Sequence, residues 1–433
     1  MSTIAAASAP ATELLRARGR ATAARDGARL ALGATAVAVA LLPLLVPHGP
    51  SNTSPIDVAI IGAVGATLLW VTSAGRRLRF PYAAPLVVFM TGGALGAMAG
   101  PVPGQGVIAL SQDLMLLAWC WTVVNVGSTP GRLKVLLTTW AYSSMVWATI
   151  LLGAVAVGSP TVAGQAARQG GRTALTFVDP TYSANYYFIS IMIICATQTP
   201  RRRSVRFLAY GLLLASLFTT GSNSGVMSIV LGVVTAKLVA VYHRRGAAAV
   251  VAGFAAIVVA GALISANVSM QSIEERAHSS QYKFIREGIG RGGKSVGQRQ
   301  TLVHESAHLY ETGGLLGQGP VSTKTRLEAE MAPFVKEAHN DYFAALTERG
   351  PIGVFGLFLL ISTIVLRARI LATTRLSRGF SAVVVRPGAL LGALAGTLAS
   401  SAVYELLHVR HVWTLFAVIA ALFIWGRGED ERA

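Results

Sequence analysis

Apolar residues run along the chain in long stretches, and short polar or basic stretches separate them. About 20 apolar residues in a helix are enough to cross a bilayer core of roughly 30 Å. The pattern therefore predicts an all-α, polytopic membrane protein of about twelve transmembrane helices. We expect these at 29–47, 55–74, 83–100, 105–126, 133–158, 181–198, 206–221, 223–242, 247–266, 351–371, 383–403 and 410–426.

The pattern leaves two arrangements open between residues 206 and 242. The sequence Gly-Ser-Asn-Ser-Gly at 221–225 fits either a short turn between two helices or a break within a tilted pair. Composition agrees with the membrane interpretation, since 53% of the residues are hydrophobic, only 13% are charged and the mean hydropathy is +0.56. Such a chain is too apolar for an ordinary soluble enzyme.

Basic residues are concentrated in alternate loops, which gives the net charge of +18 a topological meaning. The short loops on the other side of the predicted membrane carry only Arg168, Arg172 and Arg410. Because cytoplasmic loops carry the excess of Lys and Arg, we expect both termini in the cytoplasm. The excess positive charge then faces anionic membrane lipids, and we do not expect nucleic acid as a partner.

One long hydrophilic segment, residues 267–350, falls on the outer side and holds as many acidic as basic residues. Its length and balanced charge favour a folded part that covers the bundle. The predicted organisation is a cytoplasmic tail (1–28), a bundle of about nine helices (29–266), an extracytoplasmic loop with short helices (267–350), a bundle of three helices (351–426) and a second cytoplasmic tail (427–433).

Within this loop, HESAH at 304–308 matches H-E-x-x-H, in which two histidines one helical turn apart hold zinc. A helix from Arg299 to Thr312, ending at Gly313-Gly314, puts both histidines on its polar face, where solvated residues lie. The candidate third ligands follow no recognisable pattern: Glu328, Glu330, Glu337 and His339. Cys120 and Cys195 fall inside predicted spans. We therefore expect no metal site, with a zinc metalloprotease as an alternative.

A second stretch, AHNDYFAALTERGPIGVFG at 338–356, predicts a helix in which His339 leads the apolar stripe Tyr342, Phe343 and Leu346. The helix should end at Gly350-Pro351, where a predicted span begins. This arrangement places an imidazole at the outer membrane surface. Histidine, with an unperturbed pKa of about 6.5, takes a proton from an alcohol near neutral pH.

The same residues resemble the signature H-N-x-[YF]-x-x-x-L-x-E-x-G-x-x-G of the O-antigen ligase and O-antigen polymerase superfamily of bacterial envelope glycosyltransferases. The matching residues are His339, Asn340, Tyr342 or Phe343, Leu346, Glu348, Gly350 and Gly353. Upstream, RQTLVHESAHLYETGGLLGQGP is similar to the family's Arg-led helix and apolar-Gly-x-Gly turn, and in that register HESAH is ordinary helix surface.

Two further segments are similar to the family but depart from its pattern. GRTALTFVDPTYSANYYF at 171–188 looks like an Arg-led segment that opens a span, although Asp179 and Thr181 differ from the usual residues. TTGSNSG at 219–225 has Asn223 where an arginine is common.

The resemblance implies a GT-C-like enzyme that moves a glycan from a polyprenyl-diphosphate carrier, usually undecaprenyl diphosphate, to a glycan or other hydroxyl acceptor. The reaction would occur on the outer side of the bacterial cytoplasmic (inner) membrane. His339 would be the catalytic base or would orient a substrate, and Arg172 and Arg299 would bind the diphosphate through forked bonds. Supporting roles fall to Asn340, Tyr342, Glu348, Arg168, Arg286 and Arg291. The scheme needs neither a metal nor another cofactor.

Several polar residues leave alternatives open. Glu348 either pairs with Arg299 or Arg349 or is a charge at a helix end. Asp113, isolated in the fourth predicted span, either pairs within the bundle or belongs to a proton pathway. The latter would favour the main alternative function, an envelope lipid or glycan transporter or flippase. Asp57 is the only acid in the first outer loop, which disfavours a metal-dependent oligosaccharyltransferase. A last polar group is expected to rim the same cavity as His339: Glu405, His408, Arg410 and His411.

Overall fold

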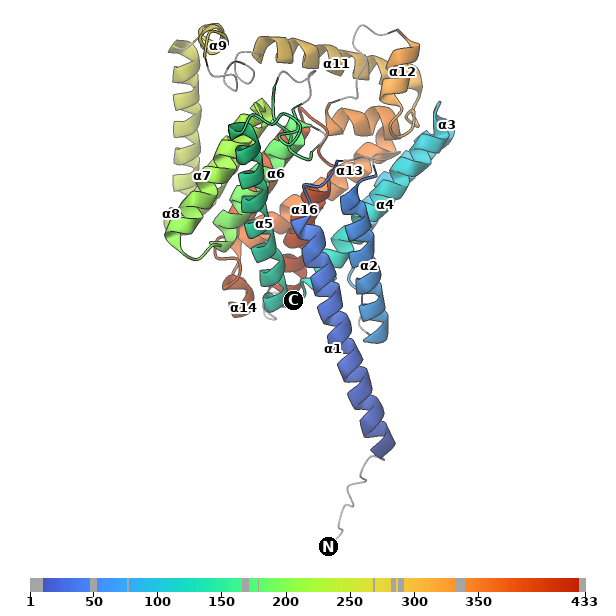
Figure 1. Ribbon diagram of the computed structural model, residues 1–433. Helices are drawn as coiled ribbons and strands as arrows, with labels where there is room; N and C mark the ends of the chain where they lie inside the picture. The colour runs from blue at the N-terminus through green and yellow to red at the C-terminus, as the bar shows by residue number, and fades with distance from the viewer. Residues whose placement is uncertain are drawn as a thin grey trace.

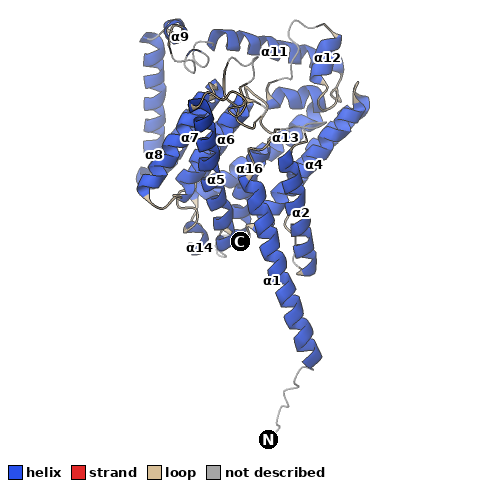
Figure 2. Cartoon of the chain, in the orientation of Figure 1, coloured by secondary structure: helices blue, strands red, loops and turns tan. Residues whose placement is uncertain are grey.

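The computed structural model describes residues 11–46, 53–75, 78–165, 171–177, 179–267, 269–281, 286, 292–331 and 339–427. Over these residues the protein is built from helices, without a β-strand, as Figures 1 and 2 show. The helices are α1 (Ala11–Ala40), α2 (Pro55–Ser73), α3 (Ala83–Ala99), α4 (Pro103–Val126), α5 (Pro130–Ala156), α6 (Pro180–Thr197), α7 (Arg203–Thr219), α8 (Asn223–Asn267), α9 (Met270–His278), α11 (Gly292–Gly313), α12 (Thr323–Ala329), α13 (Asp341–Thr373), α14 (Arg378–Ser381), α15 (Gly388–Ser401) and α16 (Arg410–Trp425).

The prediction of an all-α protein is confirmed for the described residues, and each predicted span overlaps a helix. Five helices are long and apolar enough to cross a membrane: α2, α4, α5, α8 and α13. Three shorter apolar helices, α3, α15 and α16, accompany them. The count of twelve transmembrane helices stays a prediction.

Two glycine-containing breaks divide the chain where the predicted pattern changes. Residues 220–222 form a turn between α7 and α8, which resolves the open region in favour of two helices. The predicted spans 223–242 and 247–266 form one element, α8, with a break at Gly246, where φ is 79°. Only glycine adopts this backbone readily, so the break follows directly from the sequence Arg-Arg-Gly.

The centre of the bundle is formed by α6 and α16, in which nearly every residue is buried. The indole N–H groups of two fully buried tryptophans each donate to a hydroxyl of these helices. Trp119 donates to Thr414 of α16 at 2.9 Å, and Trp140 donates to Ser190 of α6 at 2.9 Å. Because both central helices are anchored by packing and by hydrogen bonds, groups attached to their ends are held rigidly.

Small residues let the outer helices approach closely. A Cβ atom added at Gly92 of α3 would lie 2.4 Å from the backbone nitrogen of Gly353 in α13. A Cβ atom added at Gly392 of α15 would lie 2.3 Å from the carbonyl oxygen of Gly232 in α8. Glycine contacts of this kind are typical of helices that pack inside a membrane.

Residues 267–350 contain α9, α11, α12 and the first turns of α13, and Figure 1 shows α9, α11 and α12 at the end of the molecule opposite to the start of α1. The predicted helix 299–312 with its stop at Gly313-Gly314 agrees with α11, which ends at Gly313. Leu302, Ser306 and Leu309 form its buried side. That this segment lies outside the membrane stays a prediction, as do the domain boundaries.

Candidate active site

His339 lies two residues before the start of α13, in left-handed backbone conformation with φ of 50°. Its backbone N–H donates to Oε1 of Glu405 at 2.9 Å, and its half-buried ring stacks on Tyr404 with centroids 4.8 Å apart and planes 18° from parallel. Histidine is among the residues that tolerate this conformation. The prediction that His339 leads the helical stripe is wrong, because the helix begins two residues later.

Asn340 explains where the helix begins. Its Oδ1 accepts hydrogen bonds from the backbone N–H groups of Tyr342 and Phe343, at 2.9 and 3.2 Å, which is the role of an N-cap residue. Its Nδ2 donates to the carbonyl oxygen of Ala402 at 2.8 Å. The signature asparagine therefore both starts α13 and fastens the His339 segment to the connection between α15 and α16.

Asp341 adds a second attachment to the same connection. Its buried carboxylate accepts from the backbone N–H groups of Leu406, at 2.8 Å, and Leu407. The buried face of this first part of α13 consequently includes Asp341 and Ala345, whereas Tyr342, Phe343 and Leu346 are only half-buried. The predicted stripe is therefore displaced, because polar attachments and not apolar contacts orient these turns.

Aromatic rings from α6 and from the α15–α16 connection continue the surface beside His339. The ring of Tyr182 contacts Tyr404 edge-on, with centroids 5.5 Å apart, and its hydroxyl lies 3.0 Å from Nε2 of His408. His339, Tyr404, Tyr182 and His408 thus form a continuous group at the ends of the central helices α6 and α16. Tyr182 and Tyr404 were not predicted from the sequence as site residues. The only signals were their positions, one beside Pro180 at a helix start and one beside Glu405.

The predicted polar group around the last turn divides into two parts. Glu405 and His408 lie with His339, as described above. Arg410 and His411 are instead buried in the bundle. Arg410 donates from Nε and Nη2 to the two carboxylate oxygens of Asp57, at 2.9 and 2.7 Å, and Nε2 of His411 lies 3.0 Å from Oδ1 of Asn185. These two residues hold α16 against α2 and α6.

Arg172 lies at the same end of the bundle. Its Nε donates to the carbonyl oxygen of Thr220 at 2.9 Å, which attaches it to the α7–α8 turn. The start of α8 is in turn attached to the end of α15, because Ser400 Oγ donates to the carbonyl oxygen of Ser224 at 3.0 Å. Ala402, the partner of Asn340, follows two residues later. This chain of contacts links Arg172 to the His339 segment.

The remaining predicted arginines are Arg299, Arg286, Arg168 and Arg291. Arg299 lies in α11, and Arg286 is half-buried. Arg168 and Arg291 lie outside the described residues.

The comparison with protein families bears on the same segment. A family model described as O-antigen ligase matches residues 208–361, from α7 to the middle of α13. These residues, which we call the O-antigen ligase segment, are similar to that family. The match confirms the resemblance that the signature residues indicated, and it supports a membrane glycosyltransferase of the ligase or polymerase type. No curated protein sequence gives a significant match to the chain.

Within the O-antigen ligase segment, the signature glycine Gly350 marks a break in α13, with φ of 62°. The break leaves helix carbonyl groups without partners in the next turn. Two of them are satisfied by the turn that follows α11, since Gln318 N–H donates to Thr347 O and Gly319 N–H donates to Glu348 O, both at 2.9 Å. A Cβ at Gly350 would lie 2.5 Å from the carbonyl oxygen of Leu315. The turn after α11 and the break in α13, which belong to the two motifs, therefore hold each other in place. We call residues 315–319 and 347–350 the clasp.

Glu348 belongs to this clasp. Its carboxylate accepts from Val321 N–H at 3.0 Å and from the Thr323 hydroxyl at 2.8 Å, at the start of α12. Arg349, the suggested partner of Glu348, instead places Nη1 2.8 Å from Oδ2 of Asp113. The isolated acid of the fourth predicted span is therefore paired within the bundle.

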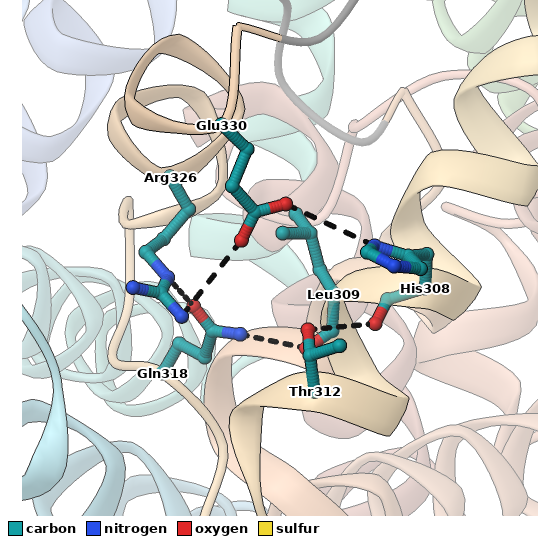
Figure 3. A network of polar contacts seen from close by, with 6 residues as sticks. All are labelled: His308, Leu309, Thr312, Gln318, Arg326 and Glu330. Carbon is teal, nitrogen blue, oxygen red and sulfur yellow. Dashed lines mark hydrogen bonds and ion pairs between the residues drawn. The ribbon is translucent and has the colours of Figure 1, made fainter.

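Side chains also join α11, the turn that follows it and α12, as Figure 3 shows. Gln318 Nε2 donates to Leu309 O at 2.6 Å and its Oε1 accepts from Arg326 Nε at 2.6 Å. Glu330 lies 3.8 Å from Arg326 Nη2 and 3.8 Å from His308 Nδ1. These contacts join α11 and α12 above the break in α13.

The two histidines of HESAH, His304 and His308, are exposed on α11. The resemblance to the family also predicts that these residues are part of the solvated helix surface. Among the residues that the structure describes, no group of three or more His, Cys, Asp and Glu side chains is arranged to hold a metal ion.

Proposed function

We propose that the protein transfers a glycan from a polyprenyl-diphosphate carrier to a hydroxyl acceptor on the outer side of the cytoplasmic membrane, with His339 as the base. One observation carries the proposal. A histidine inside an O-antigen ligase segment has its backbone held by Glu405 and its ring stacked on Tyr404, at the ends of the two central helices. Such preorganisation is what a positioned base requires.

The chemistry follows from the leaving group. A neutral imidazole at position 339 takes the proton of the acceptor hydroxyl while that oxygen attacks the anomeric carbon, and the bond between this carbon and the lipid diphosphate breaks with inversion. Negative charge develops on the departing diphosphate. Arg172 and Arg299 supply guanidinium groups for it, since arginine forms paired charge-assisted bonds to phosphate oxygens. No metal takes part in this scheme.

The backbone conformation of His339 determines which variant tests the base. Alanine at φ of 50° would add backbone strain to the loss of the imidazole. Asparagine tolerates left-handed backbone and lacks a base of suitable pKa, so His339→Asn separates the two effects. A general base contributes roughly 10²–10⁴-fold in rate. We therefore expect kcat of His339→Asn to be lower than that of the wild type by a factor within this range.

The test uses the purified full-length protein in proteoliposomes that contain an undecaprenyl-diphosphate-linked glycan, with a glycan acceptor added. Product is measured with and without EDTA, in the wild type, in His339→Asn, and in His304→Ala/His308→Ala as a matched control on the exposed face of α11. The proposal requires transfer that survives EDTA, fails in His339→Asn and persists in the control. Transport without bond formation would indicate a flippase, and EDTA-sensitive cleavage of protein would indicate a metalloprotease; either result refutes the proposal.

A further inference from the structure

A cavity of about 310 Å³ lies between α1, the end of α2 and the start of α5. The start of α1 lies at the opposite end of the molecule from α11 (Figure 1). Three arginines, Arg25, Arg29 and Arg132, line it. None of them belongs to the candidate active site, so the cavity is a separate feature of the fold.

The charges around the cavity favour an anion. Arg132 lies in the first turn of α5, whose N-terminal end carries a positive partial charge that adds to the guanidinium. Asp26 lies 3.7 Å from Arg29 and offsets part of the charge, but it does not line the cavity. Three guanidinium groups on one small cavity supply the forked donors that phosphate oxygens accept.

The remaining wall is apolar. Trp70, Ala28 and Leu32 line it, and the guanidinium of Arg132 lies over the Trp70 ring, 4.7 Å from the centroid. A free inorganic anion gains nothing from such a wall. An anionic phospholipid carries its phosphate beside glycerol carbons and acyl chains. Its phosphate therefore contacts the arginines while the adjoining carbons contact the apolar side chains. Tryptophan and arginine together are also typical of the membrane interface.

We propose that this cavity binds the phosphate-bearing headgroup of an anionic membrane lipid. The predicted topology places it at the cytoplasmic surface, where anionic headgroups face the basic loops. Its volume lies near the lower end of the roughly 300–1,000 Å³ typical of small-molecule sites. The site is independent of the transfer reaction proposed above, so a failure of either proposal leaves the other intact.

The test compares lipid binding by full-length protein with native mass spectrometry in detergent, using dioleoyl phosphatidylglycerol and dioleoyl phosphatidylcholine as probes. Arg25 and Arg29 are exposed, so Arg25→Gln/Arg29→Gln removes two charges without opening the core. Arg201→Gln/Arg202→Gln removes two exposed charges from another predicted cytoplasmic loop. Each cavity arginine donates hydrogen bonds to the phosphate in this proposal, so the first pair should weaken phosphatidylglycerol binding roughly 30-fold and the second pair should leave it unchanged.

Selective phosphatidylglycerol binding that is lost in the first variant and kept in the second supports the proposal. Equal loss in both variants would indicate attraction by net charge alone, and equal binding of the two lipids would show no headgroup recognition; both overturn it. A third arm adds inorganic phosphate and glycerol 3-phosphate as competitors. If millimolar amounts of either displace the lipid completely, the cavity takes a soluble phosphate and the lipid assignment is wrong.

Discussion

The ion pair between Asp57 and Arg410 provides the sharpest test of how the bundle is held together. Both side chains are nearly inaccessible, with 8% and 9% of their surface exposed for Asp57 and Arg410, and two hydrogen bonds of 2.9 and 2.7 Å join them. Asp57→Asn preserves the shape and removes the charge, which leaves the Arg410 guanidinium uncompensated. Removing one partner of a buried pair costs about 3–5 kcal/mol. We expect a loss of this size in the free energy of unfolding.

The effect is measured as the apparent unfolding temperature of the protein in detergent. The control is Glu328→Gln, because Glu328 and Lys324 form an exposed pair on α12, 3.7 Å apart, and such a pair is worth only about 0.3–0.5 kcal/mol. In Asp57→Asn/Arg410→Gln neither side chain is charged, so part of the stability should return. If Asp57→Asn lowers the unfolding temperature no more than Glu328→Gln does, the pair is not the buried anchor described here.

Other variants test the clasp and the candidate active site separately. Gly350→Ala should lower the unfolding temperature clearly, because it combines strained backbone with a close contact to Leu315 O, whereas Gly261→Ala, where the added atom meets open space, should not. Equal thermal shifts would contradict the role of the break. Glu405→Ala should lower kcat in the transfer assay about tenfold, because the anchor of the His339 N–H is lost, and Glu405→Gln, which keeps an acceptor oxygen, should restore most of it. If Glu405→Gln is as impaired as Glu405→Ala, positioning is not its role.

The attachments of the His339 segment fit the transfer reaction that we propose. Tyr182 and the α15–α16 connection are attached to the ends of α6 and α16, the most deeply buried helices of the bundle. The polar attachments of Asn340 and Asp341 then bring the His339 segment to this connection. In the transfer reaction that we propose, a base mounted in this way keeps its position while the large lipid-linked donor and the acceptor enter and leave.

Much of the fold was accessible from the sequence because apolar runs and glycines act locally. The runs predicted where helices form, and the Gly313-Gly314 stop and the Gly350-Pro351 break both agree with the structure. The signature around His339 also identified the O-antigen ligase segment. Two residue types in that signature are required by the backbone: Asn340 caps a helix, and Gly350 has a positive φ.

The tertiary structure alone decided which polar groups meet. Asp57 and Arg410 are 353 residues apart, and Arg349 pairs with Asp113 and not with its neighbour Glu348. Likewise, Tyr404 and Glu405 reach His339 only because α13 and the α15–α16 connection lie side by side. Hydrophobic patterning specifies that a helix is buried without specifying which helix it packs against. Contacts between charged and aromatic side chains depend on which helices pack together, so they become visible only in three dimensions.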